Sequence, residues 1–104
     1  MLPSENLGVP RPESVIDLHI ENLVDDHDSM DSTSILTYQK DHCQMCLDNA
    51  IVYQLDRIVF VHGVGNGILK KEVGKILKEN PHVESYQDAS VVEFGLGATE
   101  VILK

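Results

Sequence analysis

Short apolar segments alternate with longer amphipathic segments along the chain, and this alternation predicts its secondary structure. The first apolar segment is apolar on both faces, as a covered sheet requires, and the last alternates apolar and polar residues with the period of a strand. We predict strands over residues 14–19, 57–62, 83–89 and 98–103. We predict helices over residues 33–53 and 67–80, where apolar residues recur at helical spacing. The order is β-α-β-α-β-β.

Each predicted helix has a recognisable start, end or buried face. Asp31 or Ser32 is a suitable cap for the first helix, and Asn80 followed by Pro81 ends the second. The expected buried stripe of the first helix is Ile35, Leu36, Cys43, Cys46, Leu47, Ala50 and Ile51. The expected buried face of the second helix is Ile68, Leu69, Val73, Ile76 and Leu77, with Lys70, Lys71, Lys75 and Lys78 on its solvated side.

The length of 104 residues allows one domain. The two β-α-β connections should be right-handed and give the sheet a parallel core, and the last two strands should form an antiparallel pair. Residues 1–13 include three prolines and few core formers, so we expect them to be a flexible arm or linker. The domain itself should span residues 14–104, with an exposed acidic loop over residues 21–34.

Charge narrows the range of partners. The net charge is −9, and residues 1–56 contain eleven acidic and two basic side chains, whereas residues 57–104 contain six of each. Such a chain disfavours DNA and RNA as partners, because affinity for phosphate comes from lysine and arginine; a protein partner remains open. No apolar run is long enough for a membrane span, and the start has no signal-peptide pattern, so the default expectation is a cytoplasmic protein.

Cys43 and Cys46 form a C-x-x-C pair that has three interpretations. A redox pair would require a strand-to-helix turn before the first cysteine, and a metal site would require more ligands than His42 supplies. The favoured interpretation is two small apolar residues on the inner face of a helix. We expect His27, His42 and His82 to be surface residues.

Side chains that can take part in acid–base chemistry lie at the ends of the first two predicted strands. Asp17 and His19 end the first, and His62 ends the second, directly before a turn that contains Gly63, Gly65, Asn66 and Gly67. Parallel neighbouring strands would bring both imidazoles and the carboxylate to one edge of the sheet. A strand, a glycine-rich turn and a helix together present backbone N–H groups to an anion. This combination predicts chemistry on a phosphate group, or its capture.

Three motifs together are similar to those of the Smr (small MutS-related) domain family. That family has an LDLHG-like strand end, an HGxG turn and a late GxGxT segment. They correspond here to Ile16-Asp17-Leu18-His19-Ile20, His62-Gly63-Val64-Gly65 and Gly95-Leu96-Gly97-Ala98-Thr99. The resemblance covers residues 14–104 and implies an α/β two-layer sandwich with a four-stranded mixed sheet and two main helices. With residues 86–89 and the acidic loop, it points to a subgroup that forms the C-terminal module of larger bacterial proteins.

The resemblance also implies nucleic-acid-directed work, since Smr domains are associated with nicking of DNA and some cleave RNA. The hypothesis for this chain is that His19 and His62 act as general base and acid, while Asp17 orients a histidine. The expected phosphate-binding residues are Gly63, Gly65, Asn66, Gly67, Lys70 and Lys71. No metal site is assigned and no cofactor is established; a divalent metal held by Asp17 and His19 is an alternative.

The sequence departs from the family at Ile20, where glycine is usual, and at Val64, where lysine or arginine is frequent. The missing cation would otherwise stabilise a phosphoryl transition state. An alternative function is therefore a non-catalytic module that binds a protein or a small phosphorylated ligand. In that case Asp17 and His19 would pin the first strand to the glycine turn, and the late glycines would allow a bulge or a close approach at the sheet edge.

Overall fold

The computed structural model describes residues 13–104, so the predicted arm lies outside the described residues, apart from Glu13. The elements are β1 (Val15–Asp17), η1 (Ile20–Asn22), η2 (His27–Ser29), α2 (Ser32–Val52), β2 (Arg57–Val61), α3 (Ile68–Glu79), β3 (Val83–Asp88), α4 (Val91–Phe94) and β4 (Ala98–Leu103). The predicted order of strands and main helices is confirmed. Two short 3₁₀ turns in the acidic segment and the single turn of α4 were not predicted, because such short elements have no periodic pattern to reveal them.

The sheet is mixed and has the order β1-β2-β4-β3. β1 and β2 are parallel, and β4 runs antiparallel to both β2 and β3. The parallel part is smaller than predicted, because β4 inserts between β2 and β3. The burial of the strands explains this placement: four of the six residues of β4 are buried, whereas β3 is exposed at five of six positions and suits an edge.

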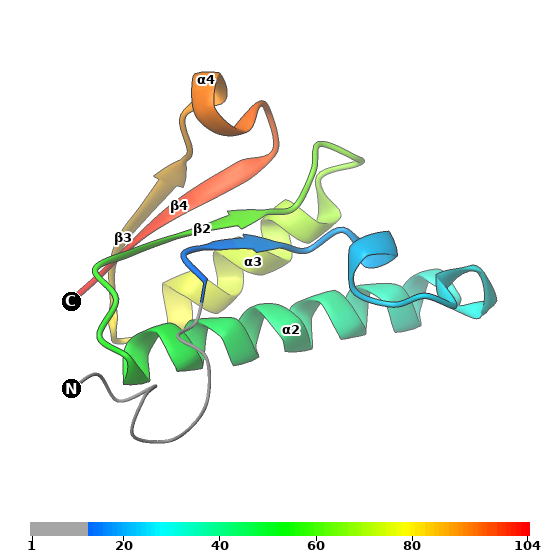
Figure 1. The fold of residues 1–104 in the computed structure, drawn as a ribbon, viewed down its shortest axis with the longest axis horizontal. Helices are drawn as coiled ribbons and strands as arrows, with labels where there is room; N and C mark the ends of the chain where they lie inside the picture. Colours follow the sequence, from blue (N-terminus) through cyan, green and yellow to red (C-terminus); the bar gives the residue numbers. More distant parts are fainter. Residues whose placement is uncertain (1–12) are drawn as a thin grey trace.

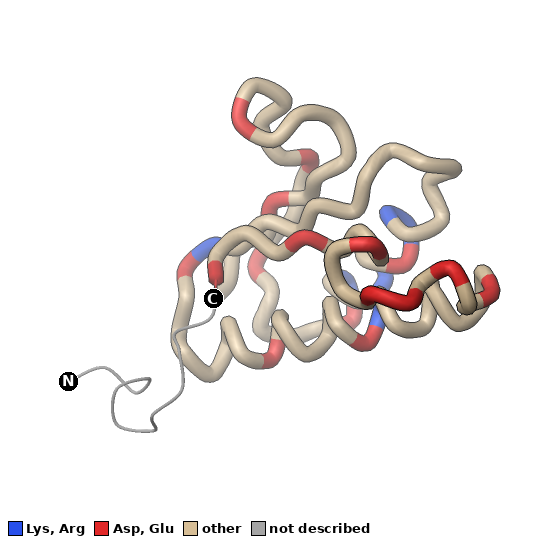
Figure 2. Tube along the Cα trace, turned by 45° about the vertical axis from the view of Figure 1, so that its right-hand side comes forward, with Lys and Arg blue, Asp and Glu red and all other residues tan. Residues whose placement is uncertain are grey.

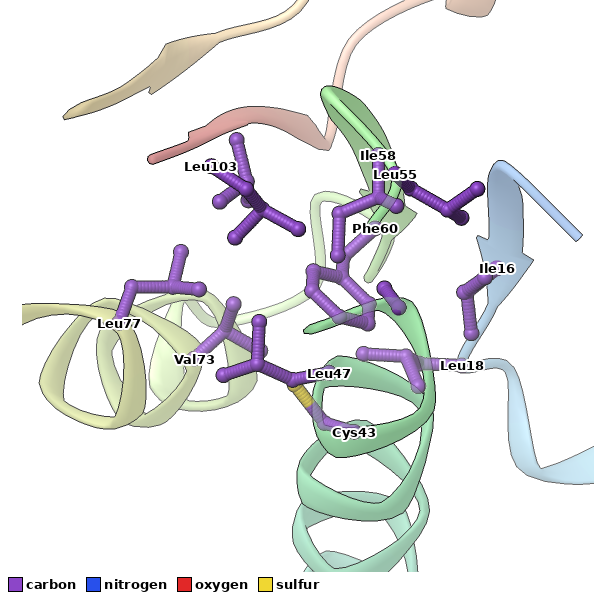
Figure 3. Packing of buried hydrophobic residues seen from close by; sticks show 12 residues of the cluster. Ile16, Leu18, Cys43, Leu47, Leu55, Ile58, Phe60, Val73, Leu77 and Leu103 are labelled. Atoms are coloured by element: carbon purple, nitrogen blue, oxygen red, sulfur yellow. The ribbon is translucent and has the colours of Figure 1, made fainter. Parts of the chain in front are cut away.

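The core lies between the sheet and the helix layer formed by α2 and α3 (Figure 1). The short α4 lies near one end of β3 and β4, where Phe94 packs against a small second cluster that includes Val59 and Ala98. Leu47 of α2 and Val73 of α3 meet Phe60 of β2 and Leu18 in this core (Figure 3). All four are fully buried or nearly so. Each such side chain contributes roughly 1.5–3 kcal/mol through its removal from water. The two-layer α/β sandwich predicted from the sequence is confirmed.

Capping of the helices follows the predictions, but burial departs from them at the start of each helix. The carboxylate of Asp31 accepts a hydrogen bond from the backbone N–H of Ser34 at 2.7 Å and caps α2. Ile35 and Leu36 of α2 are half-buried and lie outside the core cluster. Ile68, predicted to be buried, is half exposed. It is the first residue of α3, and it lines an open hollow between the starts of α2 and α3 instead of the core.

The cysteines lie on the inner side of α2, in agreement with the interpretation that they are small apolar residues on the inner face of a helix. Cys43 is buried and free, and burial together with the nearby Cys46 raises its pKa to about 12. Burial also raises the pKa of Cys46, so neither thiol has the reactive thiolate character of a redox pair. Of the three predicted surface histidines only His82 is exposed; His27 and His42 are half-buried, and the ring of His42 lies 3.5 Å from the sulfur of Cys46.

Two glycines touch where β4 begins. A Cβ at Gly97 would lie 2.7 Å from the carbonyl oxygen of Gly63 and 2.8 Å from its Cα. The carbonyl of Gly97 accepts hydrogen bonds from the N–H groups of His62 and Gly63, both at 2.9 Å. The predicted close approach is present, but it lies between two central strands and not at an edge.

Replacing Gly97 with alanine should lower the free energy of unfolding by about 2–4 kcal/mol, because the added carbon overlaps a backbone and the φ of +86° disfavours a side chain. Gly67→Ala is the matched control: Gly67 also has positive φ, but its Cβ would meet nothing within 4 Å. We expect a cost of about 1 kcal/mol there. Urea unfolding measures both, and equal losses would show that conformation alone requires glycine at position 97.

Candidate active site at the ends of β1 and β2

Asp17 and His19 form a carboxylate–imidazole pair at the end of β1. The Nδ1 atom of His19 lies 2.7 Å from Oδ1 of Asp17, and the backbone N–H of His19 donates to the same oxygen at 2.9 Å. The side-chain amide of Asn22 donates to Oδ2 at 2.6 Å. Partial burial acts to raise the pKa of Asp17, but these hydrogen bonds outweigh it and lower that pKa below the ordinary value. Asp17 is therefore an ionised, fixed acceptor.

A carboxylate at Nδ1 assigns the proton of a neutral His19 ring to that nitrogen, which leaves a lone pair on Nε2. Nothing in residues 13–104 hydrogen-bonds to Nε2. This atom lies against the glycine turn, since a Cβ at Gly63 would be 2.8 Å from it. The side chain of His19 is 39% exposed. A partly exposed, oriented ring whose Nε2 has no hydrogen-bond partner among the described residues can accept a proton from an attacking oxygen.

His62 has a different environment. It is 6% exposed, its Nδ1 lies 2.9 Å from the carbonyl oxygen of Gly63, and its Nε2 lies 2.8 Å from Oγ1 of Thr99. A carbonyl only accepts, so Nδ1 carries a proton and neutral Nε2 accepts from the Thr99 hydroxyl. Burial lowers the pKa of His62, and the positive charges of Lys70 and His19 act in the same direction. His62 is thus a neutral ring with both nitrogens engaged.

Gly63 joins the two histidines. The ring of His19 lies against its Cα side, and the ring of His62 binds its carbonyl oxygen. β1 and β2 are parallel neighbours, with Asp17 opposite Val61 and the N–H of Leu18 donating to Val61 at 2.8 Å. The structure therefore brings Asp17, His19 and His62 to one end of the sheet, as the sequence pattern predicted.

The glycine turn follows directly. Gly63, Gly65 and Gly67 all have positive φ, at +76°, +43° and +83°. The side-chain oxygen of Asn66, the residue before the N-cap Gly67, accepts from the N–H of Ile68 at 3.1 Å and so satisfies the first N–H group of α3. The turn thus has the left-handed backbone that was expected of an anion cradle, although the Asn66 side chain already has a partner.

The two lysines lie beside the turn, but they are not equivalent. Lys70 forms an ion pair with Asp88, with a distance of 3.0 Å. Lys71, with Gly67, lines a neighbouring hollow. Figure 2 shows acidic positions spread over most of the described chain and basic positions in only a few places. Local positive charge at this end of the sheet therefore comes from α3.

A hollow of about 230 Å³ opens next to the turn. Val64, Val91 and Leu96 line it together with Lys70, and all three apolar side chains are exposed. The rim of the candidate site is therefore largely apolar. A cation at position 64 would have faced this hollow.

The donor set offers little to a metal ion without substrate. Within the described part of the chain, no group of three or more His, Cys, Asp or Glu side chains could hold an ion. Asp17 and His19 are two donors that already bind one another. Water and substrate phosphate would complete the coordination of a magnesium ion there, as they usually do.

Among residues 13–104, no helix combines the length and apolarity that crossing a bilayer requires.

A family model described as "Smr domain" matches residues 38–104, well over half of the chain. The chain belongs to the Smr domain family. The matched region contains His62, the glycine turn and the late glycines; Asp17 and His19 precede it.

The Smr chain is also similar to segments of larger proteins. It is 43% identical over 58 residues to the Endonuclease MutS2 of Clostridium beijerinckii, and 40% identical over 58 residues to that of Lactococcus lactis subsp. cremoris. Each alignment covers 56% of this chain but only 7% and 8% of the relative. The chain thus spans a small part of the length of these relatives.

Two solved structures share the fold. The Smr domain of Thermus thermophilus MutS2 matches with a TM-score of 0.60 and 23% identity, over 88% of this chain and 99% of that one. YdaL, a stand-alone small MutS-related protein from Escherichia coli, matches with a TM-score of 0.60 and 19% identity, over 91% of this chain and 66% of that one. At these identities the likeness concerns the fold alone.

Two residues of the site had no predicted role. Thr99 binds His62, and Asn22 holds Asp17 in place. Thr99 stood in the late glycine motif, but the predicted antiparallel pairing joined the last two strands to each other, and the observed pairing of β4 with β2 is what places Thr99 beside the end of β2. Asn22 had no signal, because it lies in a segment without periodicity.

The lowered pKa of His62 predicts a pH dependence of stability. In the unfolded chain an imidazole has a pKa of about 6.5. Below that pH the unfolded state therefore binds more protons than the folded state, in which the pKa of His62 is lowered. The stabilisation is complete above about 6.5 and is lost as pH falls through the lowered pKa of the folded protein. We expect the urea midpoint to fall more steeply from about pH 7 to about pH 5 in the wild type than in His62→Gln. His82→Gln, at an exposed position, should keep the wild-type dependence; equal slopes in all three proteins would contradict this assignment.

Proposed function

We propose that this Smr domain cleaves phosphodiester bonds in nucleic acid, as a nicking endonuclease or an RNase. The observation that carries the proposal is the Asp17–His19 pair, whose unengaged Nε2 lies against the glycine turn. The similarity to proteins named Endonuclease MutS2 supports the same reaction class. We further propose that the domain works as a module of a larger protein, since the matched segment is a small part of those relatives.

In this mechanism His19 takes a proton from the attacking oxygen, a water or a ribose hydroxyl, as that oxygen forms its bond to phosphorus. The bond from phosphorus to the leaving oxygen breaks, and protonated His19 returns the proton to that oxygen. The ionised Asp17 stabilises the imidazolium between these steps. The left-handed turn and Lys70 or Lys71 would hold the phosphate.

Burial and two hydrogen bonds favour a positioning role for His62 over the general-acid role expected from sequence. It holds the hydroxyl of Thr99 and the carbonyl of Gly63, and thereby the wall against which His19 lies. A general acid at His62 would require Thr99 to release Nε2. Loss of the alkaline limb of the pH–rate profile in His62→Gln would support the acid role, and an unchanged profile shape at a lower rate would support positioning.

His19→Ala should lower cleavage by about 100-fold or more, because it removes the general base. Asp17→Asn should also lower the rate, since an amide neither fixes the tautomer nor stabilises the imidazolium. The measurement is nicking of a supercoiled plasmid and cleavage of a labelled RNA, each with and without magnesium. His82→Ala is the control at an exposed histidine. Cleavage at the wild-type rate in His19→Ala would refute the mechanism.

Val64→Lys should increase the cleavage rate, because it restores a cation at the rim of the site without disturbing the core. Val64 is 62% exposed, so the longer side chain has room. A cation that contacts the transition state contributes on the order of ten-fold or more in rate. Val92→Lys, on the fully exposed face of α4, makes the same charge change elsewhere and should leave the rate unchanged. Equal increases in both variants would indicate general attraction of the substrate instead of a contact at the site.

One observation favours a second function. The exposed apolar side chains of Val64, Val91 and Leu96 around the hollow resemble the surface of a protein-binding module. A domain that neither cleaves nor binds oligonucleotides, and that loses a protein partner on Leu96→Glu, would be such a module.

A further inference from the structure

A second hollow, of about 380 Å³, lies between α3 and the edge strand β3. Lys70, Lys71 and Gly74 of α3 form one side, and Tyr86 and Asp88 of β3 form the other. Thr99, which binds His62, also lines it. We call this hollow the α3–β3 groove. The proposed cleavage mechanism gives no role to Gly74 or Tyr86.

Gly74 is an unexpected residue in the middle of a helix, because glycine destabilises helix interiors relative to alanine. Packing does not require it, since a Cβ at this position would meet nothing within 4 Å. Its φ is not in the left-handed region either. The effect of glycine at this position is to keep the wall of the groove open.

Tyr86 lies across the groove. It pairs with the buried Val101 of β4, so both side chains are on the helix-facing side of the sheet. Tyr86 is nevertheless 40% exposed, and Gly74, which lines the same groove, has no side chain that could cover it. An aromatic ring in an open groove is a surface on which a flat base can stack.

Positive charge is available at the same place. Asp88 neutralises Lys70, whereas Lys71 has no ion-pair partner within residues 13–104. The groove thus combines an aromatic face, open space and one unneutralised cation next to the glycine turn. In a nucleotide complex, the aromatic face could stack with the base, the open space could hold the sugar, and the cation could bind the phosphate.

We propose that the α3–β3 groove binds an unpaired nucleotide of a single-stranded nucleic acid, with the base stacked on Tyr86 over Gly74 and a phosphate near Lys71. The proposal rests on the nucleic-acid part of the proposed function and specifies its substrate class. A duplex hides the faces of its bases, so it would not use this groove. Stacking also supplies affinity that does not depend on many phosphate contacts, which suits a chain of net charge −9.

The test is fluorescence anisotropy of the full chain with a labelled single strand of about ten nucleotides, at low salt and with EDTA so that binding is measured without cleavage. The comparison probes are a blunt duplex of the same length and a single strand with abasic sites. We expect the normal single strand to bind more tightly than either. Tyr86→Ala should weaken its binding by about ten-fold, and Tyr86→Phe should keep it. Tyr38→Ala is the matched control, at a tyrosine of similar exposure on α2.

Gly74→Leu provides a second, independent variant. The leucine should fill the groove and weaken binding to a similar extent, while the thermal midpoint stays at or above that of the wild type because the helix loses a glycine. Weaker binding in a protein of unchanged or higher stability cannot come from misfolding. Wild-type affinity in both Tyr86→Ala and Gly74→Leu, or equal affinity for abasic and normal strands, would overturn the proposal.

The two proposals fail in different ways. Cleavage that requires His19, together with binding unaffected by Tyr86→Ala, would remove the groove and leave the nuclease. Binding that requires Tyr86 and the bases, in a protein that cleaves nothing, would remove the nuclease and support the groove.

Discussion

The backbone contact between Gly63 and Gly97 fixes the geometry on which the candidate site depends. The carbonyl of Gly97 accepts two hydrogen bonds from the end of β2, and no side chain fits between the two segments. This contact sets Thr99 opposite Phe60 and beside the ring of His62. It also presents the bare Cα of Gly63 to His19. Two glycines far apart in the sequence thus hold the ends of three strands in one arrangement.

The two histidines show how the environment separates residues of one type. His19 is half-buried, bound to an ionised carboxylate through Nδ1, and has Nε2 available. His62 is buried and neutral, and both of its nitrogens are engaged. A ring that must exchange protons needs access and a fixed tautomer, whereas a ring that positions its neighbours needs burial and partners. The sequence pattern gave the two residues equal weight, and their surroundings favour different tasks.

Much of the fold was predictable because it follows from periodicity. The cap at Asp31, the strand order along the chain and the stripe on α2 from Cys43 onward are local patterns, and each is confirmed. The position of β4 between β2 and β3 was not predicted, since strand neighbours depend on which strand is most buried in the assembled sheet. Ile68 was misplaced for a related reason: its position on the helical face was correct, but the core reaches α3 only from Leu69 onward.

The candidate site also has a part that the sequence predicted and a part that it did not. Parallel pairing of β1 and β2 was sufficient to predict that Asp17, His19 and His62 share one end of the sheet. The partners that give these residues their states, Asn22 and Thr99, come from a 3₁₀ turn and from an antiparallel register, which a pattern of single residues does not contain. The α3–β3 groove could not be predicted for the same reason, because it combines the absence of a side chain at Gly74 of α3 with the ring of Tyr86 on β3.

Net charge and local chemistry need not point to the same partner. The acidic residues are concentrated in the first half of the chain, on elements that include η1 and η2, whereas α3 brings its lysines to the glycine turn. A protein of this kind repels a long duplex at a distance, because phosphates dominate the outer surface of the duplex. At short range it offers an aromatic ring, a polarised turn and one unneutralised lysine. Binding built on these contacts depends more on the bases than on the phosphates, so the acidic surface would act as a filter against duplexes while the groove selects single strands.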